Sequence, residues 1–233
     1  MLADFVALRA DLQGVATVKL WRQLSTVFVW MMLAKLLRRL GVHDATYNDE
    51  YYENDVEGPA AFAAPHIARS VVACFRPNSL IDIGCGTGAM LAQFRELGVK
   101  VSGLEYSSAG IRRCRQRGLD VMKFNIERDK PPSVHADLAL SLEVAEHLPE
   151  WASERFVKLL CQTSPIVIVS AAQPGQPGTD HVNLQPKTYW IAKFSSICGR
   201  SYNASVRERL AEEWRKAGVA GFYWDNLMVF GPG

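Results

Sequence analysis

Short apolar runs alternate with amphipathic stretches through the middle of the chain. The runs are of strand length, whereas the stretches between them carry apolar residues at helical spacing. Strands and helices that alternate in this way predict a parallel sheet with helices on both faces. The predicted strands are residues 79–86, 99–105, 120–126, 135–143 and 164–172, and the predicted helices between them are residues 89–98, 108–118 and 149–163.

The segments on either side of this core have other patterns. Residues 1–42 predict one or two helices, residues 43–59 predict a polar, aromatic and turn-rich linker or lid, and a helix follows over 60–75. The tail predicts a Pro/Gly-rich loop at 173–186, helices at 187–199 and 207–218, and short strands at 200–206 and 226–231. We therefore divide the chain into a helical extension with a lid, residues 1–58, and an α/β domain, residues 59–233.

The N-terminal segment holds an uncharged apolar run, residues 24–34, followed by a basic cluster. A membrane-spanning helix needs about 20 such residues. No small-residue cleavage site follows the run, which argues against a signal peptide. We expect a helix that packs on the domain or on a partner subunit, as in a homodimer; the alternative is a helix lying in a membrane interface.

Composition narrows the class of protein. The chain has 233 residues, 48% of them hydrophobic and 21% charged, with a net charge of +2. This balance gives no general attraction to nucleic acid or anionic lipid. The five cysteines are odd in number and form no C-x-x-C pair, so we expect reduced thiols in a cytoplasmic protein.

A glycine-rich loop follows the first predicted strand. "DIGCGTG" places Asp82, Gly84, Gly86 and Gly88 between a strand and a helix, where glycines let the backbone approach a ligand closely. The spacing fits neither G-x-G-x-x-G nor the P-loop. Glu105 ends the second predicted strand, where a carboxylate can accept both hydroxyls of a ribose. A tight turn and a solvated carboxylate are the alternative, but the combination favours a nucleoside ligand.

Several segments together resemble the class I S-adenosylmethionine-dependent methyltransferases. These are "LIDIGCGTG", "VSGLEYS", "FNIE", "ADLALSLEVAEHLP" and "NLMVF", and the resemblance covers residues 45–231. It implies a Rossmann-like sheet of seven strands, mostly parallel, with the last strand antiparallel. It also implies S-adenosylmethionine as the cofactor, bound at the carboxyl ends of the strands.

The resemblance assigns roles to individual residues. The glycines would lie against the amino acid and ribose of the cofactor, and Asp82 would orient their loop or touch the methionine amine. Tyr106, Asn125 and Ile126 would meet the adenine. "YNDEYYE" resembles a lid whose tyrosines close over the cofactor, with plain packing as the alternative. The predicted cofactor-binding residues are Asp82, Gly84, Cys85, Gly86, Gly88, Glu105, Tyr106, Asn125, Ile126 and Leu142.

An E-x-x-E-H segment follows the fourth predicted strand. In a helical turn Glu143, Glu146 and His147 would share one face, and two carboxylates crowded there repel unless a cation lies between them. His181, in the loop after the fifth strand, is the best further ligand. This set suits Mg²⁺ or Mn²⁺ and admits Zn²⁺, Fe²⁺ or Co²⁺. A hydrogen-bonded corner that shapes the cofactor pocket is the alternative.

This constellation resembles the metal site of RNA 3′-terminal 2′-O-methyltransferases, and "LEVAEHLP" also resembles the ubiquinone-pathway O-methyltransferases. We therefore expect methylation of a hydroxyl on a small molecule such as a sugar, phenol or natural product, with Glu143, His147 and His181 as catalytic residues. A metal would lower the pKa of the hydroxyl; without one, a histidine would act as the base. The alternatives are RNA 2′-O-methylation, which the balanced charge disfavours, and a metal-independent N- or C-methyltransferase.

Overall fold

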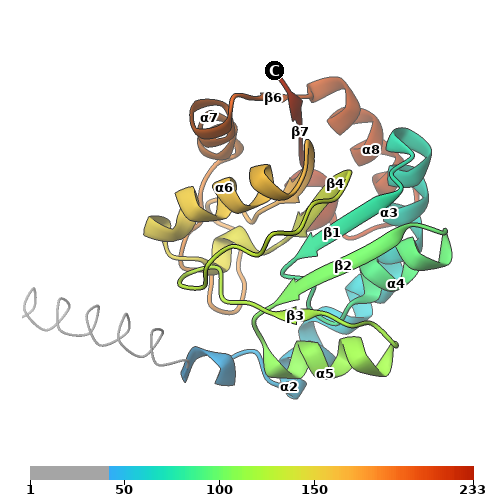
Figure 1. Ribbon diagram of the computed structural model, residues 1–233, viewed down its shortest axis with the longest axis vertical. Coiled ribbons are helices and arrows are strands. Elements are labelled where there is room, and N and C mark those ends of the chain that lie inside the picture. The colour runs from blue at the N-terminus through green and yellow to red at the C-terminus, as the bar shows by residue number, and fades with distance from the viewer. Residues whose placement is uncertain (1–41) are drawn as a thin grey trace, which may run out of the picture. The chain divides into compact units, whose positions relative to one another are not determined.

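The computed structural model describes residues 42–233, drawn in colour in Figure 1. The apolar N-terminal run and its predicted helix lie outside the described residues. The chain divides into two compact units, residues 1–45 and residues 46–233. The described part of the first unit is a 3₁₀ turn, η1 (Val42–Ala45). No helix among the described residues is both long and apolar enough to cross a bilayer.

Seven strands of the second unit form one sheet in the order β3-β2-β1-β4-β5-β7-β6. All neighbouring pairs are parallel except those of β7, which runs antiparallel to both β5 and β6. The Rossmann-like sheet with an antiparallel last strand is thus confirmed. The strands are β1 (Ser79–Ile83), β2 (Lys100–Glu105), β3 (Met122–Lys123), β4 (Leu138–Leu142), β5 (Ile166–Ser170), β6 (Arg200–Tyr202) and β7 (Met228–Pro232).

Helices cover both faces of this sheet, with α6 and α7 on one side and α3, α4 and α8 on the other (Figure 1). A short π-helix, η2 (Tyr52–Val56), and two 3₁₀ turns, η3 (Ala145–His147) and η4 (Glu150–Ala152), lie beside the strand ends. The helices are α2 (Asp49–Tyr51), α3 (Glu57–Phe75), α4 (Ala89–Glu96), α5 (Ser108–Gln116), α6 (Ser153–Thr163), α7 (Lys187–Cys198), α8 (Ala204–Lys216) and α9 (Gly221–Asp225). The sequence pattern did not predict α9.

The alternation of side chains along each strand divides the core into two layers. Leu138 and Leu140 of β4 pack toward the helices α3, α4 and α8, whereas Ala139 packs toward α6 and α7. Trp214 of α8 is fully buried, and its indole N–H donates to the Ser70 hydroxyl of α3 at 2.7 Å. Packed helices therefore cover both faces of the sheet. A ligand site is expected at the carboxyl ends of the parallel strands instead.

The basic run of α5 faces the segment that precedes α3. Arg112 donates to the Asp49 carboxylate at 2.6 Å, and Arg113 donates to the Asp49 carbonyl at 2.9 Å. Arg117 pairs with Glu57 at the start of α3. This helix face is therefore used to hold residues 49–57 over the end of the sheet.

Candidate functional site

The glycine loop links β1 to α4 at the carboxyl edge of the sheet. Gly84 has φ 78° and Gly88 has φ 77°, a region that residues with side chains rarely adopt. An added Cβ would lie 2.6 Å from Val144 at Gly84 and 2.8 Å from Leu119 at Gly88. At Gly86, with φ 55°, it would meet the Tyr52 ring at 3.6 Å and the Val56 side chain at 4.0 Å, both without a clash. The loop can therefore admit a ligand at Gly86, whereas its outer glycines are required by packing.

Glu105 at the end of β2 turns its carboxylate back to this loop. It accepts from the Gly86 amide at 2.6 Å, the Ser107 amide at 2.7 Å and the Tyr52 hydroxyl at 3.4 Å. The side chain is buried, and desolvation raises its pKa to about 7 despite these donors. A buried carboxylate that accepts hydrogen bonds at a strand end fits the ribose hydroxyls of a nucleoside.

Asp82, the other acid of the loop motif, is buried at 3% exposure in β1. Among the described residues no hydrogen-bond donor contacts its carboxylate. Burial, and then the nearby charge of Glu105, raise the pKa of Asp82 to about 8. A cationic group placed beside Asp82 would relieve this cost, so the site fits the ammonium group of an amino acid.

The predicted adenine side lies in the turn after β3. The Oδ1 atom of Asn125 accepts from the Glu127 amide at 2.8 Å, so its NH₂ group is the part that can face an adenine ring nitrogen. Arg155 of α6 donates to the Ile126 carbonyl at 2.6 Å and fixes the turn. Tyr106 is half-buried at the end of β2. Cys85 is buried in the glycine loop, with its Sγ 4.0 Å from that of Cys114 on α5.

The raised pKa values of Asp82 and Glu105 predict that the ligand-free protein loses stability as the pH rises. The folded state keeps protons that the unfolded chain releases near pH 4, so the free energy of unfolding falls between about pH 4 and about pH 8. Each group contributes up to about 1.4 kcal/mol per pH unit in its window. Urea unfolding across this range should show the slope, and Asp82→Asn should reduce it. An unchanged slope, matching that of the exposed control Asp120→Asn, would contradict the assignment.

Glu143 directly follows β4 and has a strained backbone conformation, with φ 54°. Its amide donates to the Ser170 carbonyl of β5 at 3.1 Å. Its carboxylate accepts from the Asn226 amide group at 3.2 and 3.3 Å, and the Asn226 Oδ1 atom accepts from Gln173 at 3.1 Å. Glu143 is thus held toward the start of β7. Leu142, before it, closes β4 and is half-buried.

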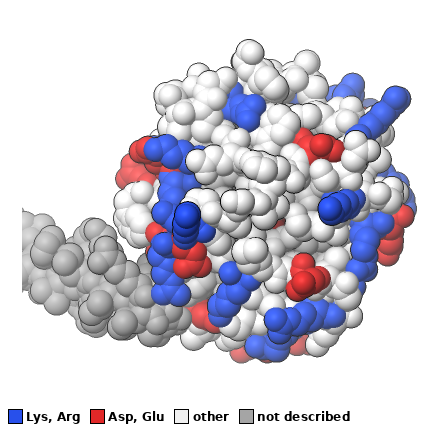
Figure 2. Space-filling view, viewed as in Figure 1, with Lys and Arg blue, Asp and Glu red and all other residues white. Residues whose placement is uncertain are grey.

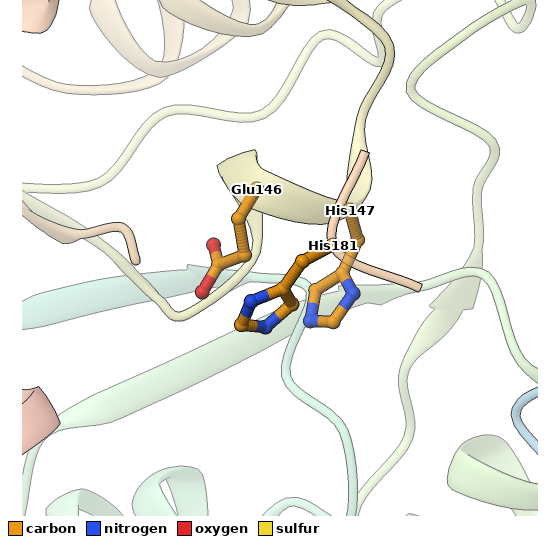
Figure 3. Close-up of side chains that lie close together, drawn as sticks. All are labelled: Glu146, His147 and His181. Atoms are coloured by element: carbon orange, nitrogen blue, oxygen red, sulfur yellow. The ribbon is translucent and has the colours of Figure 1, made fainter. Parts of the chain in front are cut away.

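The remaining residues of the E-x-x-E-H segment gather around a second point. Glu146, His147 and His181 each offer a donor atom within 4.8 Å of the others. Glu146 and His147 come from η3 and His181 comes from the loop after β5, and the two imidazole rings lie side by side (Figure 3). Their centroids are 5.1 Å apart. Of the four predicted metal ligands, the structure brings these three together, whereas the Glu143 carboxylate is engaged with Asn226.

Glu146 is the buried acid of this cluster, with no solvent exposure. Its Oε1 atom accepts from the Ala172 amide at 3.2 Å, but among the described residues its Oε2 atom has no hydrogen-bond partner. Desolvation, followed by the charge of Glu143, raises the pKa of Glu146 well above its usual range. Desolvation also raises the pKa of Glu143. A divalent cation in the cluster fits this orphaned oxygen and would offset the repulsion.

The loop at 173–186 is fastened against η3. The amides of Val182 and Asn183 donate to the Glu146 carbonyl at 2.9 and 3.0 Å. The Tyr47 hydroxyl donates to Asp180 at 2.9 Å, and the Tyr47 ring meets His147 edge-on at 5.7 Å. These contacts hold His181 beside Glu146.

Two residues near the site were not found from the sequence. Asn226 is fully buried and donates to Glu143. Tyr223 of α9 is also buried, and burial, followed by the charges of Glu143 and Asp82, raises the pKa of its phenol. Both precede β7. Because β7 is antiparallel, its first residue lies at the edge where the other strands end, so the residues before it reach the site. The antiparallel direction expected for the last strand is the signal that could have found them.

This fold and strand-edge site define a class I S-adenosylmethionine-dependent methyltransferase domain. A family described as "Methyltransferase domain" matches residues 56–218, and the chain belongs to that family.

Curated relatives named ubiquinone biosynthesis O-methyltransferase are similar to this chain. The protein from Hahella chejuensis is 26% identical over 148 residues, and that from Methylobacterium sp. (strain 4-46) is 32% identical over 145 residues. Each alignment covers 59% of this chain, and they cover 55% and 53% of the two relatives. The chain therefore spans about half the length of the curated relatives it matches.

Solved structures share the fold at low identity. The sugar N-methyltransferase KedS8 from Streptoalloteichus sp ATCC 53650 has a TM-score of 0.59 and 15% identity, covering 79% of this chain and 92% of that chain. The plantazolicin methyltransferase BpumL in complex with SAH has a TM-score of 0.54 and 16% identity, covering 85% and 97%. At these identities the likeness shows the fold alone.

Proposed function

We propose that the protein transfers the methyl group of S-adenosylmethionine to a hydroxyl of a small molecule, assisted by a divalent cation that Glu146, His147 and His181 hold. The observation that carries this proposal is the convergence of two imidazoles on a buried carboxylate with an orphaned oxygen. The names of the two curated relatives support oxygen as the methyl acceptor.

The donor set bears on the choice of metal. With Glu143 engaged by Asn226, two nitrogen atoms and one oxygen atom remain. Mn²⁺ fits this set better than Mg²⁺, which prefers an all-oxygen shell, and Zn²⁺, Fe²⁺ and Co²⁺ also accept it. When bound there, a divalent cation would lower the pKa of a coordinated hydroxyl.

The remaining site residues bind the cofactor or take part in the proton transfer. Asp82 and Glu105 orient the cofactor, and the strand edge aligns the acceptor oxygen with its methyl carbon. The acceptor oxygen forms its bond to that carbon as the carbon–sulfur bond breaks. Glu143, held by Asn226, is the carboxylate best placed to take the hydroxyl proton.

A small-molecule acceptor is favoured over nucleic acid by charge. The net charge is +2, and Figure 2 shows Lys and Arg interspersed with Asp and Glu on the face that it displays. A protein that binds nucleic acid through phosphate contacts concentrates basic residues along one surface.

The function can be tested by turnover with labelled S-adenosylmethionine and a panel of phenols, catechols and sugars. We expect methyl ethers as products, loss of turnover after exhaustive chelation, and recovery with Mn²⁺. Recovery should follow the occupancy of one site, measured separately by electron paramagnetic resonance of bound Mn²⁺. Full turnover after chelation would contradict the metal-assisted mechanism. A product methylated on nitrogen or carbon would contradict O-methylation.

A further inference from the structure

Tyr52 is the most deeply buried residue of the segment that precedes α3. Its side chain is 4% exposed at the start of η2, and its hydroxyl donates to the Glu105 Oε1 atom at 3.4 Å. Its ring lies beside Gly86, where an added Cβ would approach it to 3.6 Å. The phenol thus lies between the two elements that are expected to bind the cofactor, the glycine loop and the end of β2.

A third element converges on the same point. At Gly110, in the first turn of α5, an added Cβ would lie 2.9 Å from the Tyr52 hydroxyl and 3.1 Å from the Glu105 Cγ atom. The Gly86 carbonyl oxygen would lie 2.8 Å away, and because Gly110 has no side chain, the helix can approach all three groups closely. Burial, and then the charge of Glu105, raise the pKa of the Tyr52 phenol well above its usual range, so it stays protonated at neutral pH. A protonated phenol can both donate and accept, whereas a carboxylate only accepts.

The contacts of Glu105 show why a second group is useful there. Its Oε2 atom already accepts from the Gly86 amide, and its Oε1 atom accepts from the Ser107 amide. A ribose diol brings two hydroxyls, each of which both donates and accepts. A carboxylate accepts from the hydroxyls of the diol but offers no hydrogen to their oxygen atoms. The Tyr52 hydroxyl has one hydrogen, which it donates to Glu105 over a long 3.4 Å, so this hydrogen can turn to a ribose oxygen when the cofactor binds.

We propose that Tyr52 is a further cofactor-binding residue, whose hydroxyl acts beside Glu105 on the ribose hydroxyls of S-adenosylmethionine. The inference rests on the S-adenosylmethionine dependence of the domain. It separates Tyr52 from Tyr47, whose hydroxyl contacts Asp180 in the loop that carries His181.

The test compares ligands that differ only in the ribose. Calorimetry measures binding of S-adenosylhomocysteine and of its 2′-deoxy and 3′-deoxy analogues to the wild type and to Tyr52→Phe. The wild type should prefer the full ribose, and Tyr52→Phe should reduce that preference by about three- to tenfold for at least one of the two hydroxyls, the loss of one hydrogen bond. If Tyr52→Phe weakens all three ligands equally, or none, the proposal is overturned.

Control variants distinguish the loss of a ribose contact from a general loss of affinity or of folding. Tyr189→Phe removes a buried hydroxyl on α7 that has no hydrogen-bond partner among the described residues, and it should keep the wild-type preference. Tyr47→Phe should also keep it, even if absolute affinities change. Tyr52→Met provides a second loss of the hydroxyl should the phenylalanine variant fold poorly, and it should show the same reduced preference. A wild type that binds no S-adenosylhomocysteine would instead overturn the cofactor itself.

Discussion

Replacing Glu105 by glutamine is expected to weaken the binding of S-adenosylhomocysteine by about 10- to 100-fold while leaving the protein folded. A charge-assisted hydrogen bond to a buried carboxylate contributes about 1.5–3 kcal/mol, which corresponds to this range. Stability should change little, because the substitution removes a carboxylate that is costly to bury: burial raises the pKa of Glu105 to about 7. That gain offsets the loss of one acceptor for the Gly86 and Ser107 amides.

The measurement is calorimetric titration together with thermal unfolding of both proteins. Glu96→Gln is the matched control, because it makes the same chemical change on the exposed face of α4 and should leave the affinity unaltered. If Glu105→Gln binds the ligand as tightly as the wild type, Glu105 does not hold the ribose, and the acidic end of β2 has only a structural role.

Replacing Glu146 by glutamine is expected to have opposite effects on stability and activity. The metal-free protein should become more stable, because Glu146 is fully buried beside Glu143 and its Oε2 atom has no partner among the described residues. A glutamine keeps the acceptor for the Ala172 amide and can donate its NH₂ group to Glu143. Turnover should fall at least about 100-fold, because a metal ligand is lost.

Thermal unfolding in chelator, Mn²⁺ affinity and turnover test this expectation separately. Glu150→Gln, exposed in the same segment, is the control and should alter none of them. Gly178→Ala keeps every donor but would place a Cβ 2.1 Å from the His181 ring, so it should weaken Mn²⁺ binding without loss of a ligand. Glu146→Gln with wild-type turnover would show that Glu146 only shapes the pocket.

Much of the fold could be predicted from the sequence, because the strands of a sheet buried on both faces form apolar runs that end at glycines. The third strand was predicted over 120–126 but is only Met122–Lys123. It is an edge strand that pairs with β2 alone, and Asn125 then turns the chain away. The helix α9 is five residues long, too short for a helical period to appear in the sequence.

The site was predicted less completely, because distant contacts decide it. Spacing alone placed Glu143 on the same helical face as Glu146 and His147. In the structure Glu143 has a left-handed backbone before the 3₁₀ turn begins, and its carboxylate, which still lies near Glu146, accepts from Asn226, 83 positions away. In the same way, the basic run of α5 could not be matched to Asp49 and Glu57 until the fold placed them together.

The most direct test is a crystal structure with S-adenosylhomocysteine and Mn²⁺, using anomalous scattering at the manganese edge. The ribose should lie on Glu105 and Tyr52, the amino group of the ligand near Asp82, and one anomalous peak between Glu146, His147 and His181. A ligand bound away from the carboxyl ends of β1 and β2 would contradict the cofactor site. A fully occupied ligand with no anomalous peak at the cluster would contradict the metal-assisted mechanism.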